Sequence, residues 1–205
     1  MLENYIVTIG RQYGSGGREI GKKLADRLEF AYYDTLLLEN VAKNSGLSDA
    51  IISKYDEKLH DKWMSISLGM SAASDRHKLP VPLRAALGQF EEVEKIGRRG
   101  SAVIVGRCAD QILKGRANIL SVFIHADMEL RVARVSERNQ ISEAEAKKRI
   151  KNTDKGRAAF YNYYTDAEWG KTDNYHLCID SGVFGIDGTV TVLEACVNNR
   201  ITPQK

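Results

Sequence analysis

Gly10-Arg11-Gln12-Tyr13-Gly14-Ser15-Gly16-Gly17-Arg18-Glu19 is the most informative stretch of this chain. The apolar run at 5–9 before it predicts a buried strand, and the spacing of apolar residues at 20–28 predicts a helix after it. Glycines let the backbone turn tightly and bring N–H groups close to an anion, and the start of a helix adds about half a positive charge. A strand, a glycine-rich turn and a helix in this order therefore predict a phosphate-binding site, with a purely structural turn as the alternative.

The turn departs from the common ATP-binding sequence G-x-x-x-x-G-K-[ST]. With Gly14-Ser15-Gly16 aligned to that pattern, Gly17 stands where the lysine belongs and Arg18 follows it. Arg18 could supply the missing charge, because a guanidinium binds phosphate through two parallel hydrogen bonds. Alternatively, Arg18 is a solvent-facing arginine in the first turn of the helix. The turn alone leaves both interpretations open.

The rest of the chain alternates between predicted strands and helices. Short apolar runs predict strands at residues 31–33, 102–105, 119–124 and 175–179. Helical spacing predicts helices at residues 49–70, 82–96, 128–138, 142–164 and 188–198. Strands that are apolar on both faces are typical of parallel sheets covered by helices, so the chain is predicted to have an α/β fold. The mostly helical residues 35–99 resemble an insertion over one edge of the sheet.

The composition excludes several classes of protein. With 205 residues, 43% of them apolar and 28% charged, the chain is predicted to form one globular domain. It has no apolar run near the roughly 20 residues that span a bilayer and no signal-peptide pattern, so we expect a cytoplasmic protein without a membrane partner. A net charge of +3 is too small to predict a nucleic-acid polymer as a partner. Cys108, Cys178 and Cys196 are far apart, and we expect reduced thiols.

Several short motifs occur in the order typical of one family. Residues 11–21 are similar to a degenerate phosphate loop, and Tyr32-Tyr33-Asp34-Thr35 is similar to a Tyr-Leu-Asp-Thr/Ser sequence that follows a second strand. Further matching segments are Val81-Pro82-Leu83-Arg84-Ala85-Ala86-Leu87, Val103-Ile104-Val105-Gly106-Arg107, residues 123–131, Asp154-Lys155-Gly156-Arg157 and Ile179-Asp180-Ser181. With these motifs the chain resembles the cytidylate kinase-like family, which is related to bacterial cytidylate kinase within the P-loop nucleoside monophosphate kinases.

The resemblance implies a P-loop NTPase three-layer fold with a five-stranded parallel sheet. A single domain would consist of a core (1–35 and 100–205), a helical monophosphate-binding insertion (about 36–99) and a lid (about 142–170). The implied reaction is phosphoryl transfer from ATP to a pyrimidine nucleoside monophosphate, with CMP or dCMP favoured. Mg²⁺ would arrive with ATP, and the protein would be a monomer or a homodimer.

The resemblance also implies roles for individual residues. Gly14, Ser15, Gly16, Gly17 and Arg18 would bind the phosphates of ATP, with the Ser15 hydroxyl a possible contact to phosphate or Mg²⁺. Arg107 and Arg84 would bind the acceptor. Alternatively, Arg107 forms an ion pair at the end of the strand, and Arg84 is a solvated arginine on a helix. Asp34 would orient Arg84 or the base, or else cap a helix.

The lid, together with Arg131 from the helix before it, would supply the remaining catalytic groups. Arg157, together with Arg131 and Arg149, would close over the transferring phosphoryl group beside Arg18. Asp154 would orient Arg157, or else form an ordinary surface pair. This interpretation requires the guanidinium groups, which come from distant segments, to converge on one cavity.

Two departures from the family pattern leave other functions open. The lysine of the phosphate loop is absent, and an Asp-Gly-Arg-Asp sequence is reduced to Val105-Gly106-Arg107-Cys108, with Asp110 an uncertain substitute. One alternative is therefore a nucleotide-binding protein with weak or no kinase activity. Another is a small-molecule kinase with a non-nucleotide acceptor.

Overall fold

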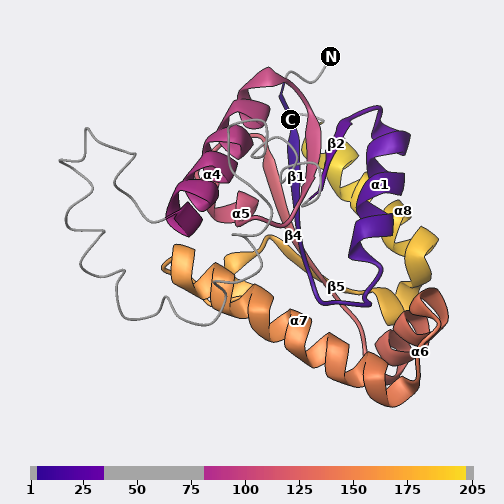
Figure 1. The fold of residues 1–205 in the computed structure, drawn as a ribbon. Coiled ribbons are helices and arrows are strands. Elements are labelled where there is room, and N and C mark those ends of the chain that lie inside the picture. The colour runs from indigo at the N-terminus through magenta and orange to yellow at the C-terminus, as the bar shows by residue number, and fades with distance from the viewer. Residues whose placement is uncertain (1–3, 35–80, 202–205) are drawn as a thin grey trace.

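A computed structural model describes residues 4–34 and 81–201 of the chain. Five strands form one sheet in the order β2-β3-β1-β4-β5, and every neighbouring pair is parallel (Figure 1). The strands are β1 (Ile6–Arg11), β2 (Ala31–Tyr33), β3 (Ala102–Val105), β4 (Ile119–His125) and β5 (Leu177–Asp180). This confirms the predicted five-stranded parallel sheet. β1 differs from the prediction, because it continues through Gly10 to Arg11.

The helices agree with the predicted order and differ at some ends. They are α1 (Gly17–Leu28), α4 (Val81–Arg99), α5 (Ala109–Ile112), α6 (Met128–Asn139), α7 (Glu143–Tyr164), the 3-10 helix η4 (Thr172–Asn174) and α8 (Ser181–Ile201). The short α5 was not predicted. α8 starts earlier than the predicted 188–198 because it includes a first segment that ends at Gly185, whose φ of 66° and ψ of 179° interrupt the helix.

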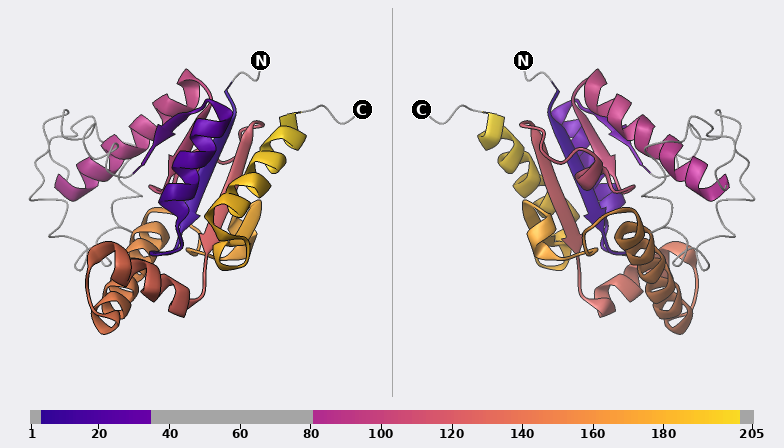
Figure 2. Two further views of the ribbon diagram at one scale, coloured as in Figure 1. Left: turned by 90° about the vertical axis from the view of Figure 1, so that its right-hand side faces the viewer. Right: turned by 90° about the vertical axis from the view of Figure 1, so that its left-hand side faces the viewer.

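Helices cover both faces of the sheet and make three layers. In Figure 2, α1 and α8 lie side by side over one face. Ile20 and Leu24 of α1 are fully buried against that face, and a side chain at Gly21 would come within 2.8 Å of Val105. Gly21 therefore lets α1 approach the sheet closely. α4 and α5 cover the other face through buried apolar residues that include Val93, Ile96, Ala109 and Leu113.

The helix pair α6 and α7 lies beyond the carboxyl ends of the strands (Figure 1). Ser142 caps the N-terminus of α7, because its hydroxyl oxygen accepts a hydrogen bond from the Glu145 amide at 3.3 Å. Val135 of α6 and Ile150 of α7 are fully buried against each other's helix, and Tyr13 of the glycine-rich turn packs against the same cluster. α7 is thereby fixed next to the turn.

Much of the predicted insertion at 36–99 lies outside the described residues, including the predicted helix at 49–70. Its last helix, α4, is described and packs against the sheet through Val93 and Ile96. The bounds of the insertion and of the lid remain predictions. Among the described residues, no helix is both long enough and apolar enough to span a membrane.

Candidate active site

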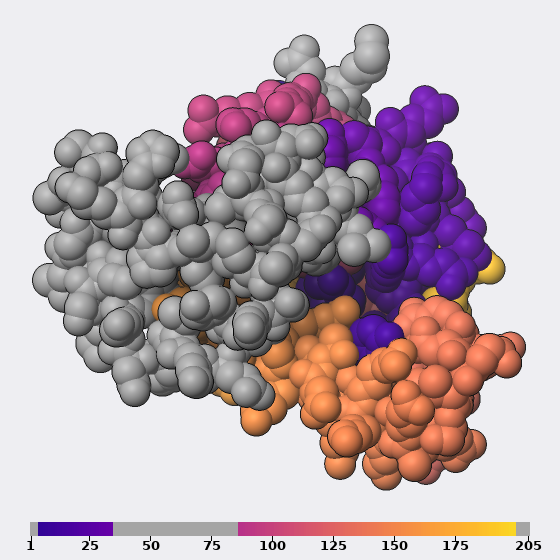
Figure 3. Space-filling view, in the orientation of Figure 1, coloured from indigo at the N-terminus to yellow at the C-terminus, as the bar shows by residue number. Residues whose placement is uncertain are grey.

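A cavity of about 820 Å³ opens at the carboxyl ends of β1 and β3. Its walls are the glycine-rich turn, the segment after β3, and one side of α7. Open α/β sheets place their ligands at this edge, so the cavity lies where the predicted phosphate site belongs. In Figure 3, indigo atoms from the N-terminal part of the described chain lie beside the orange atoms of α7.

The backbone of the glycine-rich turn lies along the cavity. Gly14 and Gly16 have φ values of 84° and 80°, a left-handed conformation that glycine adopts without steric cost. α1 starts at Gly17, and its N-cap residue, Gly16, has no side chain that could bond the N-terminal amides. These amides and the positive end of α1 are suited to an anion. Gly14, Gly16 and Gly17 all line the cavity, as does Arg18.

Ser15 is oriented differently from its neighbours. Its side chain is fully buried, and its hydroxyl donates a hydrogen bond to the Gln12 carbonyl at 2.9 Å. The Ser181 hydroxyl donates to the Ser15 carbonyl at 2.6 Å and so connects the turn to the start of α8. Ser15 is not among the residues that line the cavity, and in this structure it stabilises the shape of the turn.

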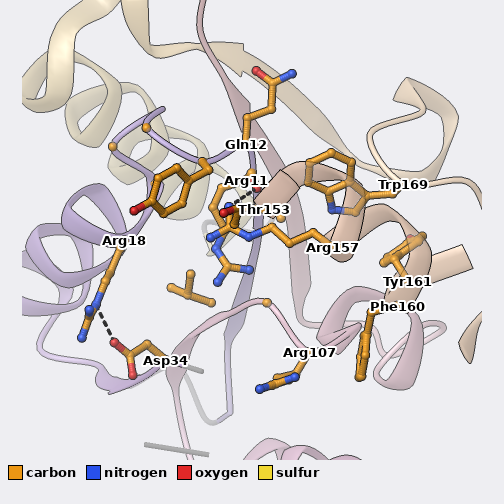
Figure 4. A pocket seen from close by; sticks show the side chains of 18 of the residues that line it. Arg11, Gln12, Arg18, Asp34, Arg107, Thr153, Arg157, Phe160, Tyr161 and Trp169 are labelled. Carbon is orange, nitrogen blue, oxygen red and sulfur yellow. Dashed lines mark hydrogen bonds and ion pairs between the residues drawn. The ribbon is translucent and has the colours of Figure 1, made fainter. Parts of the chain in front are cut away.

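Arg11 lines the cavity and lies close to Arg157 (Figure 4). It is the last residue of β1, and the sequence analysis gave it no role. Burial, together with the nearby charges of Arg157 and Arg107, lowers the pKa of Arg11 to about 9. Its guanidinium is still positively charged at neutral pH.

Arg157 reaches the same place from α7. Its guanidinium donates a hydrogen bond to the Arg11 carbonyl at 3.0 Å and lies 5.5 Å from the centre of the Tyr13 ring. Burial is the main reason that the pKa of Arg157 is lowered. Arg157 therefore joins the middle of α7 to the end of β1, at the cavity.

Arg107 lies on the cavity wall that the segment after β3 forms, opposite the glycine-rich turn. It follows β3 with a φ of 57°, and its guanidinium is 5.4 Å from the centre of the Phe160 ring, a cation–π distance (Figure 4). Arg11, Arg107 and Arg157 thus converge on one cavity from three distant segments. Arg107 and Arg157 are among the arginines that the sequence interpretation named, and Arg11 is not.

Arg18 and Asp34 form an ion pair at the rim of the cavity, with Nε and Oδ2 2.7 Å apart. The Arg18 side chain is 64% exposed, whereas that of Asp34 is 6% exposed. Asp34 thus contacts an arginine, but this arginine comes from the start of α1, whereas the resemblance implied Arg84 or the base as the partner. Arg84 belongs to the first turns of α4, whose side chains lie outside the described part of the chain.

Arg131 and Asp154 lie behind the turn and are not among the residues that line the cavity. The Arg131 guanidinium pairs with Asp154 at 2.7 Å, and both side chains are largely buried. The other oxygen of Asp154 accepts a hydrogen bond from the Tyr13 amide at 2.7 Å, while Arg157 is 4.0 Å away. Asp154 therefore holds the turn against α6 and α7. Arg149 pairs with Glu145 on the exposed side of α7.

A hydrogen-bonded carboxyl group lies at another part of the cavity wall. The Tyr161 hydroxyl donates a hydrogen bond to Oδ2 of Asp110 at 2.6 Å, and the side-chain amide of Gln111 donates to the same oxygen at 3.1 Å. Burial raises the pKa of Asp110, although these hydrogen bonds oppose the rise. Burial and the neighbouring Asp110 also raise the pKa of Tyr161, so its hydroxyl stays protonated and acts as the donor.

Comparison with known proteins identifies the family. A sequence model of the cytidylate kinase-like family matches residues 6–183. The chain belongs to this family. The cytidylate kinase of Methanocaldococcus jannaschii is 22% identical over 197 residues, which cover 95% of this chain and 98% of that protein. The cytidylate kinase of Aeropyrum pernix is 24% identical over 181 residues, which cover 88% and 91%.

Solved structures show the same architecture. A protein of Eubacterium ventriosum described as uncharacterized matches with a TM-score of 0.73 and 28% identity, covering 95% of this chain and 98% of that one. Shikimate kinase from Bacteroides thetaiotaomicron matches with a TM-score of 0.54 and 12% identity, covering 95% and 98%. The fold of this cytidylate kinase-like protein is therefore that of the P-loop kinases.

Several residues that line the cavity were not predicted from the sequence. Arg11 belongs to the quoted turn, but the ATP-binding pattern places its cation at position 17 and not at position 11. Phe160 and Thr153 lie on the cavity side of α7, which only the placement of that helix reveals. Arg138 lies 5.2 Å from the Tyr13 ring centre and also lines the cavity. The segment 147–157 is rich in lysine and arginine, and of these basic residues Arg157 is the one that lines the cavity.

Proposed function

We propose that the protein transfers the γ-phosphoryl group of ATP to a pyrimidine nucleoside monophosphate, with CMP or dCMP as the first candidates. The observation that supports this most strongly is the convergence of Arg11, Arg107 and Arg157 beside the glycine-rich turn. Both substrates are polyanions, and their repulsion must be neutralised before the reacting oxygens align. Membership of the cytidylate kinase-like family agrees with a kinase of this class.

The donor side of the site is assigned to the turn. The amides of Gly14, Gly16 and Gly17 would bind the β- and γ-phosphates of ATP, helped by the positive end of α1. Arg18 would contact the phosphates from the rim, with its guanidinium held by Asp34. Ser15 would act through the shape of the turn, since its hydroxyl is bonded to a backbone carbonyl.

The acceptor side is assigned to the opposite wall. Arg107 would bind the α-phosphate of the monophosphate, with Arg84 as a second contact from α4. Arg157 would neutralise the phosphoryl group in transit, because it reaches the cavity between the two sides. Arg131 and Asp154 would be positioning residues that hold the turn in place. An oxygen of the acceptor phosphate would then attack the γ-phosphorus in line, and ADP would leave.

Mg²⁺ would enter with ATP as part of this proposal. It usually keeps several waters and binds through one or two carboxylates together with phosphate oxygens. Asp34 fits this requirement, because its carboxylate lies at the cavity on the side of the turn. The ion would neutralise charge on the β- and γ-phosphates.

A substrate panel tests the proposal. The purified protein is incubated with ATP, Mg²⁺ and each of CMP, dCMP, UMP and AMP, and ADP release is measured against a reaction without acceptor. We expect ADP with CMP or dCMP at a rate well above that control. Absence of ADP above the control with all four monophosphates would refute the proposed activity.

A kinase for a non-nucleotide acceptor is the second candidate. It is supported by fold similarity to shikimate kinase and to a gluconokinase from Sinorhizobium meliloti, which matches with a TM-score of 0.52, 11% identity and coverage of 96% and 95%. ADP release with a panel of small hydroxylated acids, and none with monophosphates, would favour it. Stabilisation by ATP without ADP release in either panel would instead indicate nucleotide binding without turnover.

A further inference from the structure

The ATP-binding pattern G-x-x-x-x-G-K-[ST] has a glycine at its first position and a lysine at its seventh. In this chain the seventh position is Gly17, so the first position is Arg11. The cation and the glycine have therefore exchanged places. The departure from the pattern is an exchange between two positions, and the loop has not simply lost a charge.

The two positions share one space in the structure. A Cβ atom added to Gly17 would lie 2.6 Å from the Cβ and 3.0 Å from the Cγ of Arg11. Real Cβ atoms do not approach each other this closely, and the Cβ of Arg11 is fixed by the backbone of β1. Only one of the two positions can therefore have a side chain without moving the turn.

The Arg11 side chain uses the space that two glycines leave open. Beyond Gly17 it reaches Gly106, where an added Cβ would lie 3.0 Å from Cζ of the Arg11 guanidinium and closer still to Nη1. The guanidinium thus lies between the turn and the end of β3, inside the cavity. Arg107 and Arg157 add further positive charge around it. Like charges brought together in a cleft attract an anion strongly.

We propose that Arg11 is the cation that binds the β- and γ-phosphates of ATP in place of the lysine of the phosphate loop. This inference rests on the proposed use of ATP as donor. A lysine at position 17 would extend from the start of α1, whereas Arg11 enters from the end of β1 across the same turn. Its planar guanidinium can bind two phosphate oxygens at once, which an ammonium group cannot do in a fixed geometry.

The first experiment separates the charge of Arg11 from its packing. Arg11→Met keeps an unbranched stem over Gly17 and removes the charge, and Arg11→Lys keeps a charge. Binding of ATP and of pyrophosphate is measured by isothermal titration calorimetry. We expect Arg11→Met to weaken both ligands roughly tenfold to a hundredfold, and Arg11→Lys to weaken them less. Arg27→Met is the control, because Arg27 pairs with Glu194 on the exposed side of α1.

The second experiment tests the exchange itself. Arg11→Gly and Gly17→Lys are made singly and together, which restores the common pattern in the double variant. We expect each single variant to lose ATP affinity and the double variant to recover it to within a few-fold of the parent. Circular dichroism and thermal melting confirm that each variant is folded. Full ATP affinity in a folded Arg11→Met variant, or a folded double variant as weak as Arg11→Gly, would overturn the inference.

These measurements distinguish the inference from the proposed function. Binding of ATP and pyrophosphate is measured without an acceptor, so it does not depend on which molecule is phosphorylated. If the Arg11 variants lose ATP affinity while no monophosphate is phosphorylated by the parent, the role of Arg11 stands and the acceptor assignment fails. If CMP is phosphorylated and Arg11→Met binds ATP normally, the proposed function stands and the inference fails.

Discussion

Three consecutive residues after β3 have left-handed backbone conformations. Gly106, Arg107 and Cys108 have φ values of 86°, 57° and 54°. For the two residues with side chains this conformation costs roughly 1–2 kcal/mol each. The turn directs Arg107 to the cavity wall beside Phe160 before α5 begins at Ala109. Strain of this kind is typical of sites where a side chain must be presented to a ligand.

Substitution of Arg107 should separate strain from binding. We expect Arg107→Ala to weaken CMP binding roughly tenfold to a hundredfold while largely sparing ATP, because the hydrogen bonds of one charged group are lost. Arg107→Gly should weaken CMP binding similarly and be about 1 kcal/mol more stable than Arg107→Ala, since glycine adopts positive φ freely. Calorimetric titration and urea denaturation measure the two effects.

The control for both variants is Arg98→Ala, which removes an exposed arginine of α4 that pairs with Glu94. It should leave CMP affinity unchanged. Unaltered CMP affinity in Arg107→Ala would show that Arg107 does not contact the acceptor.

Cys108 should be unreactive in the folded protein. Burial and the neighbouring Asp110 raise the pKa of its thiol to about 12, so almost no thiolate is present at pH 8. We expect iodoacetamide at pH 8 to label Cys108 only after denaturation, and the partly exposed Cys196 to be labelled earlier. Mass spectrometry of tryptic peptides measures both sites. Equal labelling rates for Cys108 and Cys196 in the native protein would contradict this.

At the scale of elements, the glycine-rich turn is held by a helix that is distant in sequence. Asp154 of α7 accepts the Tyr13 amide and pairs with Arg131 of α6. Arg157, one turn further along α7, donates to the carbonyl of Arg11. Displacement of α7 would therefore disturb the turn and the Arg157 guanidinium together. Phosphate binding and the position of α7 are expected to depend on each other.

Removal of the Asp154 carboxylate tests this connection. We expect Asp154→Ala to lower the free energy of unfolding by about 3 kcal/mol, because Arg131 would remain buried without its counter-charge. ATP affinity should also fall, since the Tyr13 amide loses its acceptor. Urea denaturation and calorimetry measure the two changes.

Glu145→Ala is the matched control on the same helix, because Glu145 pairs with Arg149 in an exposed i,i+4 arrangement. It should change stability by less than about 1 kcal/mol. Equal losses in the two variants would mean that Asp154 is only another surface carboxylate.

At the scale of the whole molecule, Asp110 should make stability depend on pH. Its pKa in the folded state is raised, chiefly by burial. Its contribution to the free energy of unfolding is therefore fully present below the pKa that Asp110 has in the unfolded chain. This contribution is lost as the pH rises through the higher pKa that Asp110 has in the folded state. Asp110→Asn removes this loss, and its amide oxygen can still accept from Tyr161. We expect the stability of Asp110→Asn relative to the parent to increase between pH 4 and pH 7.

Urea denaturation at pH 4, 5.5 and 7 measures this difference. Asp26→Asn is the control for loss of a carboxyl group at the surface, where Asp26 pairs with Lys22. If the stability of Asp110→Asn relative to the parent falls as pH rises, the pKa of Asp110 is not raised by folding.

The sheet could be predicted because its strands are short apolar runs with glycine-rich or polar neighbours. Residues 102–105 and 119–124 are buried on both faces, as their largely apolar sequences indicated. The three layers followed from the alternation of these runs with amphipathic helices. The edge of the sheet at which the site lies was likewise predictable, because only Gly106 separates Arg107 from the end of a predicted strand.

The arrangement within the site depends on contacts that local sequence does not reveal. Arg131 was expected at the cavity, but its pairing with Asp154 of another helix keeps it behind the turn. The importance of Arg11 depends on how near it lies to Gly17 across the turn. The left-handed conformation of Cys108 depends on the chain around it, since cysteine has no preference for positive φ.

The shared space of positions 11 and 17 limits how such a loop can arise by mutation. A lineage that passes from a lysine at 17 to an arginine at 11 must cross either a form with neither cation or a form whose two side chains collide. Both intermediates should be selected against, so the two changes have to be inherited nearly together. Descendants should then form two separate groups, with few chains in between.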